Sequence, residues 1–177
     1  MASWKFTFAA LLIGVPVAAL AQDNISKQIV NNPSAPDVSG AKASLVDDAK
    51  VEGGKALRVQ VPKKGANPWD SSVGGAINKP IAKGDHLILH FSARLEKGEN
   101  GAVTATLPYN AIQLAAAPYS TLVQGSGEIG PDWKVFNVEG TSDGAYAPGQ
   151  LKVTIQLATA KQTVDFGPIV VLDTSNK

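Results

Sequence analysis

The stretch from His86 to Leu95 constrains the fold of this chain more than any other part of the sequence. Every second position in it is apolar: Leu87, Leu89, Phe91, Ala93 and Leu95. A two-residue period predicts a β-strand with one face in a core and the other toward water or a ligand. Turn-forming residues lie between Pro80 and the start of this stretch, and again between its end and Ala102. The strand is therefore bounded on both sides. We expect the polar side of its sheet to contribute to function.

The same alternation recurs along the chain. Leu57, Val59 and Val61 form one apolar row, and a second begins at Leu151 and continues through Val153. Between such rows lie turns rich in Gly, Pro, Asn and Asp, which predicts about nine to eleven short strands. The segment 111–117 has a helix-like composition, but prolines bound it closely. The expected fold is therefore all-β, a single antiparallel β-sandwich of the jelly-roll type.

The N-terminal residues 1–21 read as a signal peptide. Lys5 precedes an apolar run, and Ala19-Leu20-Ala21 has the small-x-small form of a signal-peptidase site. We expect cleavage after Ala21, and so no membrane association of the mature chain. Residues 22–42 form an N-terminal segment with a possible edge strand, and residues 43–177 form the sandwich domain.

Charge and cysteine content narrow the possible partners and location. The formal net charge is +1, and removal of the signal peptide with Lys5 leaves the chain close to neutral. Nucleic acids and anionic membranes both require clustered positive charge, so neither is an expected partner. The chain has no cysteine, so its stability depends on its core. We expect a monomeric bacterial protein that is secreted or periplasmic.

Five segments in a fixed order resemble a known family. They are Gly-Gly-Lys-Ala-Leu-Arg-Val (53–59), Asn-Pro-Trp-Asp (67–70), Lys-Gly-Asp-His-Leu-Ile-Leu-His-Phe-Ser-Ala-Arg (83–94), Asp-Trp-Lys-Val-Phe (132–136) and Thr-Val-Asp-Phe-Gly-Pro-Ile-Val-Val-Leu (163–172). Together they resemble the carbohydrate-binding modules of the family 4/9 group, galactose-binding-like jelly rolls that accompany bacterial xylanases. The resemblance extends from about Ala43 to Asp173.

This resemblance implies a concave sheet face that binds xylan or β-glucan, often with a structural calcium ion at the edge. The chain departs from the family pattern at its N-terminal segment. Val30-Asn31-Asn32-Pro33 stands where the family has an Asn-Gly-(Asp)-Phe-Glu segment. For the calcium site, the resemblance points to Asp165 with carbonyl groups of the Gly53-Gly54 turn, since calcium prefers carboxylate and carbonyl oxygens.

Aromatic residues outside the apolar rows are candidates for sugar binding, because sugar rings stack on aromatic faces while their hydroxyls need planar polar groups. Trp69 lies in a polar loop, where it either binds sugar or packs against the rim of the sandwich. Tyr109 and Tyr119 flank a segment that contains Gln113. They form either the wall of a groove or an edge of the sheet, where the rings pack and the hydroxyls remain in water. Trp133 opens an apolar strand, so a structural role is favoured there.

Four polar residues lie on the outward faces of two expected strands: Arg58, Gln60, His90 and Arg94. If both strands belong to one sheet, these side chains form a polar floor that can hold sugar hydroxyls. A solvated sheet face is the alternative.

A catalytic constellation is not recognisable. His86 and His90 are four residues apart on one strand, about 13 Å from each other and too far to share a metal ion. The carboxylates that a glycosidase would need have no recognisable setting; the available ones are Asp47, Asp48, Asp70, Glu128 and Asp165. We therefore expect a non-catalytic secreted carbohydrate-binding domain. The alternatives are a structural or adhesive β-sandwich that contacts another protein, an accessory part of a glycoside-hydrolase system, and a polysaccharide-processing enzyme.

Overall fold

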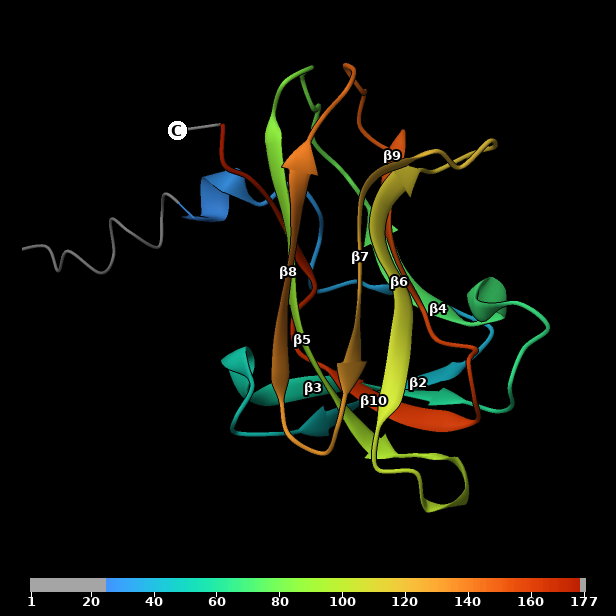
Figure 1. The fold of residues 1–177 in the computed structure, drawn as a ribbon. Coiled ribbons are helices and arrows are strands. Elements are labelled where there is room, and N and C mark those ends of the chain that lie inside the picture. Colours follow the sequence, from blue (N-terminus) through green and yellow to red (C-terminus); the bar gives the residue numbers. More distant parts are fainter. Residues whose placement is uncertain (1–24, 176–177) are drawn as a thin grey trace, which may run out of the picture.

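The computed structural model describes residues 25–175, which contain two antiparallel β-sheets, an α-helical turn at 25–28 and three short 3-10 helices (Figure 1). The strands are β1 (Asp37–Ser39), β2 (Lys42–Asp47), β3 (Lys55–Val61), β4 (Ser72–Ala76), β5 (His86–Lys97), β6 (Ala105–Leu114), β7 (Thr121–Ile129), β8 (Lys134–Thr141), β9 (Leu151–Gln156), β10 (Gln162–Phe166) and β11 (Val170–Asp173). The 3-10 helices are η1 (Glu52–Gly54), η2 (Pro68–Asp70) and η3 (Glu99–Gly101). The predicted signal peptide lies outside the described residues. Within them, no helix combines the length and the apolar character needed to span a membrane.

One sheet has five strands in the order β1-β4-β9-β6-β7. The other has the order β11-β5-β10-β3-β2, with β8 paired along the free side of β5. Neighbouring strands are antiparallel throughout, and the inward faces of the two sheets share one apolar core. The predicted β-sandwich is confirmed.

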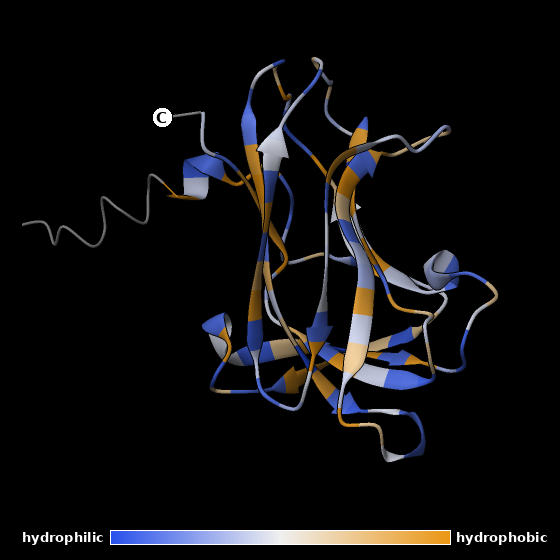
Figure 2. Cartoon of the chain, viewed as in Figure 1, coloured by the Kyte–Doolittle hydropathy of each residue, from blue (hydrophilic) through white to orange (hydrophobic). Residues whose placement is uncertain are grey.

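Strand β5 is the longest and connects the parts of the six-stranded sheet. It pairs with β8 along His86–Ala93, with β11 along Leu87–His90, and with β10 along Ala93–Lys97. Its alternate residues from Leu87 to Leu95 are buried, as the two-residue period predicts. In Figure 2, hydrophobic segments alternate with hydrophilic ones along the strands on both sides of the core.

Strand β6 contains a proline, Pro108, in its interior. It is continuous from Ala105 to Leu114, and its register with β7 shifts between Leu107 and Asn110. Pro108 lies within this irregularity, where a missing backbone N–H interrupts no ladder bond. The proline therefore introduces a bulge into the strand and does not end it.

The segment before Ala43 contributes to the sandwich. Val30 is buried in the core, and its backbone N–H donates to the carbonyl of Val171. Strand β1, in the same segment, pairs with β4 at the border of the five-stranded sheet.

Asn110 is a polar residue in an apolar setting. It is fully buried opposite Ile155, and neither its Oδ1 nor its Nδ2 has a hydrogen-bond partner within residues 25–175. A buried amide without partners costs about 1–3 kcal/mol. We expect Asn110→Val to raise the free energy of unfolding by about 1–2 kcal/mol, measured by urea denaturation. A lower stability of this variant would show that the amide is stabilising after all.

Candidate functional site

The outer face of the five-stranded sheet carries a row of polar side chains. Lys152 on β9 pairs with Gln113 on β6, and Gln113 pairs with Thr121 on β7. Their neighbours along the strands, Ile112 and Val153, are buried in the core. Alternation along each strand therefore turns Lys152 and Gln113 to the outside of the sandwich, where Lys152 is partly exposed and Gln113 is covered, with 7% of its surface exposed.

Two tyrosines join this row. The Tyr109 hydroxyl lies 2.5 Å from Oγ1 of Thr121, and the Lys152 ammonium lies 5.2 Å from the centre of the Tyr119 ring. Tyr119 is 52% exposed and has a positive φ of 58°, a conformation that is strained for a tyrosine. Its backbone N–H donates to the carbonyl of Ala116, so a tight turn presents its ring to solvent. We call these five residues the tyrosine cluster: Tyr109, Gln113, Tyr119, Thr121 and Lys152.

A hollow of about 300 Å³ lies beside the tyrosine cluster on β1, β4 and β9. Lys152 and Thr154 line one side of it, and small residues from β4 contribute to its surface. Gly74 is required there, since a Cβ on this residue would lie 2.0 Å from the carbonyl oxygen of Val153. The sheet face therefore offers a shallow groove, and Lys152 connects it to the exposed ring of Tyr119.

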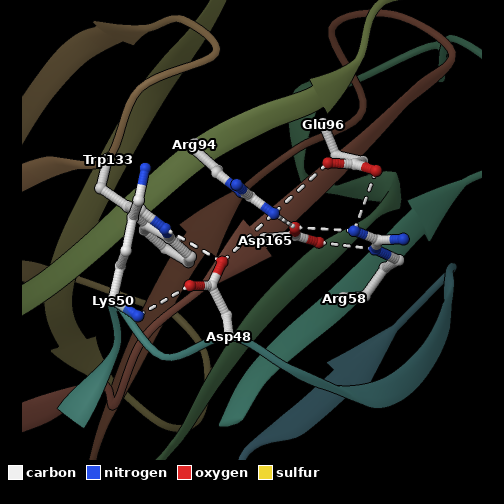
Figure 3. A network of polar contacts seen from close by, with 7 residues as sticks. All are labelled: Asp48, Lys50, Arg58, Arg94, Glu96, Trp133 and Asp165. Carbon is white, nitrogen blue, oxygen red and sulfur yellow. Dashed lines mark hydrogen bonds and ion pairs between the residues drawn. The ribbon is translucent and has the colours of Figure 1, made fainter. Parts of the chain in front are cut away.

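Arg58 and Arg94 lie on the outer face of the other sheet. Both strands that carry them belong to the six-stranded sheet, as the polar-floor hypothesis requires, but β10 separates them and places Asp165 in between. The Asp165 carboxylate accepts hydrogen bonds from Arg58 at 2.8 and 2.9 Å and from Arg94 at 2.9 and 3.1 Å (Figure 3). Glu96 contacts both guanidinium groups from the more exposed side.

Further contacts of Arg94 extend this ion network. Its guanidinium lies over the Trp133 ring at 5.1 Å and 3.3 Å from a carboxylate oxygen of Asp48, which accepts a hydrogen bond from the Trp133 indole (Figure 3). The backbone N–H of Lys50 also donates to Asp48, and it is the main cause of a lowered pKa at Asp48. Hydrogen bonding to Asp165 raises the pKa of Arg58. The half-buried Trp133 packs within this network, in agreement with the structural role favoured for it.

The predicted site is therefore corrected in one respect. Arg58 and Arg94 cannot share a groove with Tyr109 and Tyr119, because the two pairs lie on opposite outer faces of the sandwich. Their guanidinium groups are held by Asp165, so they are engaged in structural ion pairs.

Asp165 does not fit the calcium site that the resemblance implies. The carboxylate is fully buried and both of its oxygens accept hydrogen bonds from cationic guanidinium groups. Calcium requires several free oxygen ligands, and a site between two positive charges disfavours it. Among residues 25–175, no group of three or more His, Cys, Asp or Glu side chains is arranged to hold a metal ion.

The remaining candidates lie apart from the tyrosine cluster. Gln60 is exposed near the end of β3, and Nδ1 of His90 lies 2.7 Å from Oδ1 of Asn137 on β8. Trp69 is 60% exposed in η2, which leads directly into β4 and so places it near the Ser72 end of the five-stranded sheet. The sequence had given no reason to select Lys152 or Thr121. The alternation of Leu151, Lys152 and Val153 could have identified the lysine as outward-facing.

Comparison with known proteins shows where this fold occurs. No protein-family model and no curated protein matches the chain. A solved structure described as "CBM4 structure and function" has a TM-score of 0.60 and 17% identity, covering 79% of this chain and 95% of that one. The cellulose-binding domain of Cellulomonas fimi β-1,4-glucanase C has a TM-score of 0.55 and 19% identity, covering 81% of this chain and 91% of its own.

A third similar structure is the CBM22-1 xylan-binding domain of Paenibacillus barcinonensis Xyn10C. Its TM-score is 0.55 at 12% identity, and the match covers 78% of this chain and 85% of that chain. At these identities the likeness establishes the fold. The resemblance seen in the sequence is confirmed at this level: the chain has the β-sandwich fold of the carbohydrate-binding modules that accompany xylanases and glucanases.

Proposed function

We propose that this chain is a non-catalytic carbohydrate-binding domain, exported by a bacterium after removal of residues 1–21, and that its tyrosine cluster binds β-linked polysaccharide of the xylan or β-glucan type. The observation that carries the proposal is the gathering of Tyr109 and Tyr119 on one sheet face beside a shallow groove. The fold, shared with modules whose names state xylan or cellulose binding, supports it.

The tyrosine cluster provides both kinds of contact that a sugar chain needs. The exposed ring of Tyr119 offers an apolar face for the C–H groups of a sugar, and the ammonium group of Lys152 beside it offers donors for the sugar hydroxyls. The groove beside them is lined in part by Gly74 and Gly75, which have no side chains to fill it. A flat, open sheet face suits an extended polymer better than a small enclosed ligand.

Four of the five carboxylates that a hydrolase could use have structural contacts. Asp48 and Asp165 belong to the ion network, and Asp47 pairs with Lys55 at 2.6 Å. Asp70 accepts a hydrogen bond from the backbone N–H of Asn67 within the η2 cap. The groove itself includes Asp37, whereas glycoside hydrolysis uses two facing carboxyl groups. These contacts favour binding over catalysis.

Tyr119→Ala is expected to weaken binding of xylohexaose or cellohexaose about tenfold, because stacking on an aromatic ring contributes about 0.5–1.5 kcal/mol beyond burial. Tyr119→Phe keeps the ring and should retain most of the affinity. Isothermal titration calorimetry of the exported chain measures both, with wild-type dissociation constants expected between about 10 μM and 1 mM.

Leu45→Ala is the matched control, since Leu45 is 66% exposed on the other sheet and its loss removes apolar surface away from the cluster. Equal dissociation constants for wild type, Tyr119→Ala and Leu45→Ala would show that the tyrosine cluster is not the sugar-binding site. Absence of wild-type binding to any neutral glycan would favour the alternative of a sandwich that contacts another protein. Trp69→Ala, in the same series, tests whether the site extends to the Ser72 end of the sheet.

A further inference from the structure

A second hollow, of about 1000 Å³, lies at one end of the six-stranded sheet, away from the tyrosine cluster. Four separate chain segments line it: 40–42, 60–62, 97–100 and 161–163. Strand pairing brings them together, because Lys42 pairs with Gln60, Gln60 with Thr163, and Thr163 with Lys97. The hollow is therefore built on a hydrogen-bonded sheet, which fixes the spacing of its side chains.

The lining of this hollow is positively charged. It contains Lys42, Lys97 and Lys161, while Glu99 is the one carboxylate among its described lining residues. No ion pair or hydrogen bond joins the three ammonium groups to any residue within 25–175. Glu99 accepts a hydrogen bond from the backbone N–H of Lys161, which leaves the lysine side chain itself unneutralised. We call this feature the basic hollow.

Uncompensated positive charge around a concave surface raises the local concentration of anions. Neutral polar groups lie between the lysines: the amides of Gln60 and Asn100 and the hydroxyl of Thr163. A compact anion such as phosphate is best held by guanidinium forks or by clustered backbone N–H groups, whereas lysines act as point charges. Spaced ammonium groups with amides and hydroxyls between them match a molecule that carries both carboxylates and hydroxyls.

We propose that the basic hollow binds carboxylated sugar residues, so that the chain has a second saccharide site that recognises uronate units. The site is independent of the tyrosine cluster, since it lies on the other sheet and shares no residue with it. The carboxylate of a uronate pairs with the lysines, and its ring hydroxyls bond to Gln60, Asn100 and Thr163. A polymer with both neutral and acidic units can engage the two sites together and gain avidity.

The test is titration of the exported chain with three oligosaccharides at low ionic strength: a linear trigalacturonate, a xylo-oligosaccharide bearing one glucuronate branch, and the same xylo-oligosaccharide without the branch. The double variant Lys42→Gln/Lys97→Gln should bind trigalacturonate at least about tenfold more weakly, because each lost charge-assisted hydrogen bond accounts for roughly that factor. It should also lose any preference for the branched over the unbranched xylo-oligosaccharide. Binding of the unbranched sugar should not change. Which acidic sugar binds more tightly identifies whether the uronate belongs to a linear polyuronate or to a branch.

Lys50→Gln/Lys83→Gln is the matched control, with the same change in net charge. Lys50 lies beyond the far end of β2 from Lys42, and Lys83 precedes the opposite end of β5 from Lys97. Equal loss of uronate binding in both double variants would overturn the proposal, because it would reduce the effect to net charge. Absence of wild-type binding to trigalacturonate, together with equal affinities for the branched and unbranched sugars, would also overturn it.

The two sites can fail separately in this experiment. Tyr119→Ala should weaken binding of the unbranched sugar and leave binding of trigalacturonate unchanged. If the wild-type chain binds trigalacturonate but not the unbranched sugar, the proposed function of the tyrosine cluster is contradicted. If the wild-type chain binds the unbranched sugar but shows neither trigalacturonate binding nor a preference for the branched sugar, the basic hollow is contradicted.

Discussion

Replacement of Asp165 by alanine is expected to lower the free energy of unfolding by about 3–5 kcal/mol. The carboxylate is fully buried and accepts hydrogen bonds from both Arg58 and Arg94 (Figure 3). Without it, the two guanidinium groups on either side of β10 lose their only fully buried anion among the described residues. Glu96 still contacts both groups and Asp48 contacts Arg94, but both of these carboxylates are more exposed than Asp165. The loss of one buried partner is costly because the charges left behind are only partly solvated.

Urea denaturation of Asp165→Ala and Glu96→Gln compares a buried and a more exposed member of the same network. Glu96 has a side chain that is 37% exposed, so its replacement should cost about 1 kcal/mol or less. Similar losses in both variants would contradict the central role of Asp165. Below its melting temperature, Asp165→Ala should still bind neutral oligosaccharides with wild-type affinity, because the ion network lies on the sheet opposite the tyrosine cluster.

Phe91→Ala is expected to destabilise the fold by about 3–5 kcal/mol, the usual cost of deleting a buried phenylalanine side chain. Phe91 is fully buried at the middle of β5 and stacks on Phe136 of β8 with ring centres 4.8 Å apart. The ring centre of Phe166 lies 6.2 Å from that of Phe91. Phe166 belongs to β10, which pairs with β5 on the side away from β8. The ring therefore joins three strands, and its removal leaves a cavity that the surrounding sheets cannot fill without breaking their register.

Phe91→Leu provides the control, because leucine fills more of the same space and should cost clearly less than alanine. Denaturation midpoints at an unchanged urea m-value separate a loss of stability from a change in the unfolded state. If alanine and leucine had equal effects, the aromatic stack rather than the cavity would account for the stability of this part of the core.

The residues of β8 and β7 explain why this aromatic stack can form where the two sheets meet. A Cβ on Gly127 of β7 would lie 2.5 Å from the Phe136 ring, so glycine is needed to admit that ring. A Cβ on Gly125 would likewise meet the side chain of Val138 at 2.9 Å. In the sequence these glycines resemble a flexible turn region, yet both belong to strand β7. Each glycine is needed because a side chain of β8, in the other sheet, packs against it. Only the tertiary structure identifies this neighbour.

The sequence by itself determined the local properties of each strand. The two-residue period placed Leu87, Phe91 and Leu95 in the core and Arg94 outside it, and the structure confirms this. It also indicated that Tyr109, Gln113 and Tyr119 belong together, since they are close in sequence and only one turn separates β6 from β7. Such local information is reliable because side-chain direction in a strand depends on the backbone alone.

Which outward faces lie together was decided only by the tertiary structure. Arg94 and Gln113 both point away from the core, yet β10 lies beside one and β9 beside the other, on opposite sides of the sandwich. Strand pairing joins segments far apart in the chain, and the two-residue pattern is the same whichever sheet a strand enters. The sequence also contains no sign that strand pairing places the Asp165 carboxylate between two arginines. Without that information, Asp165 was expected at a metal site.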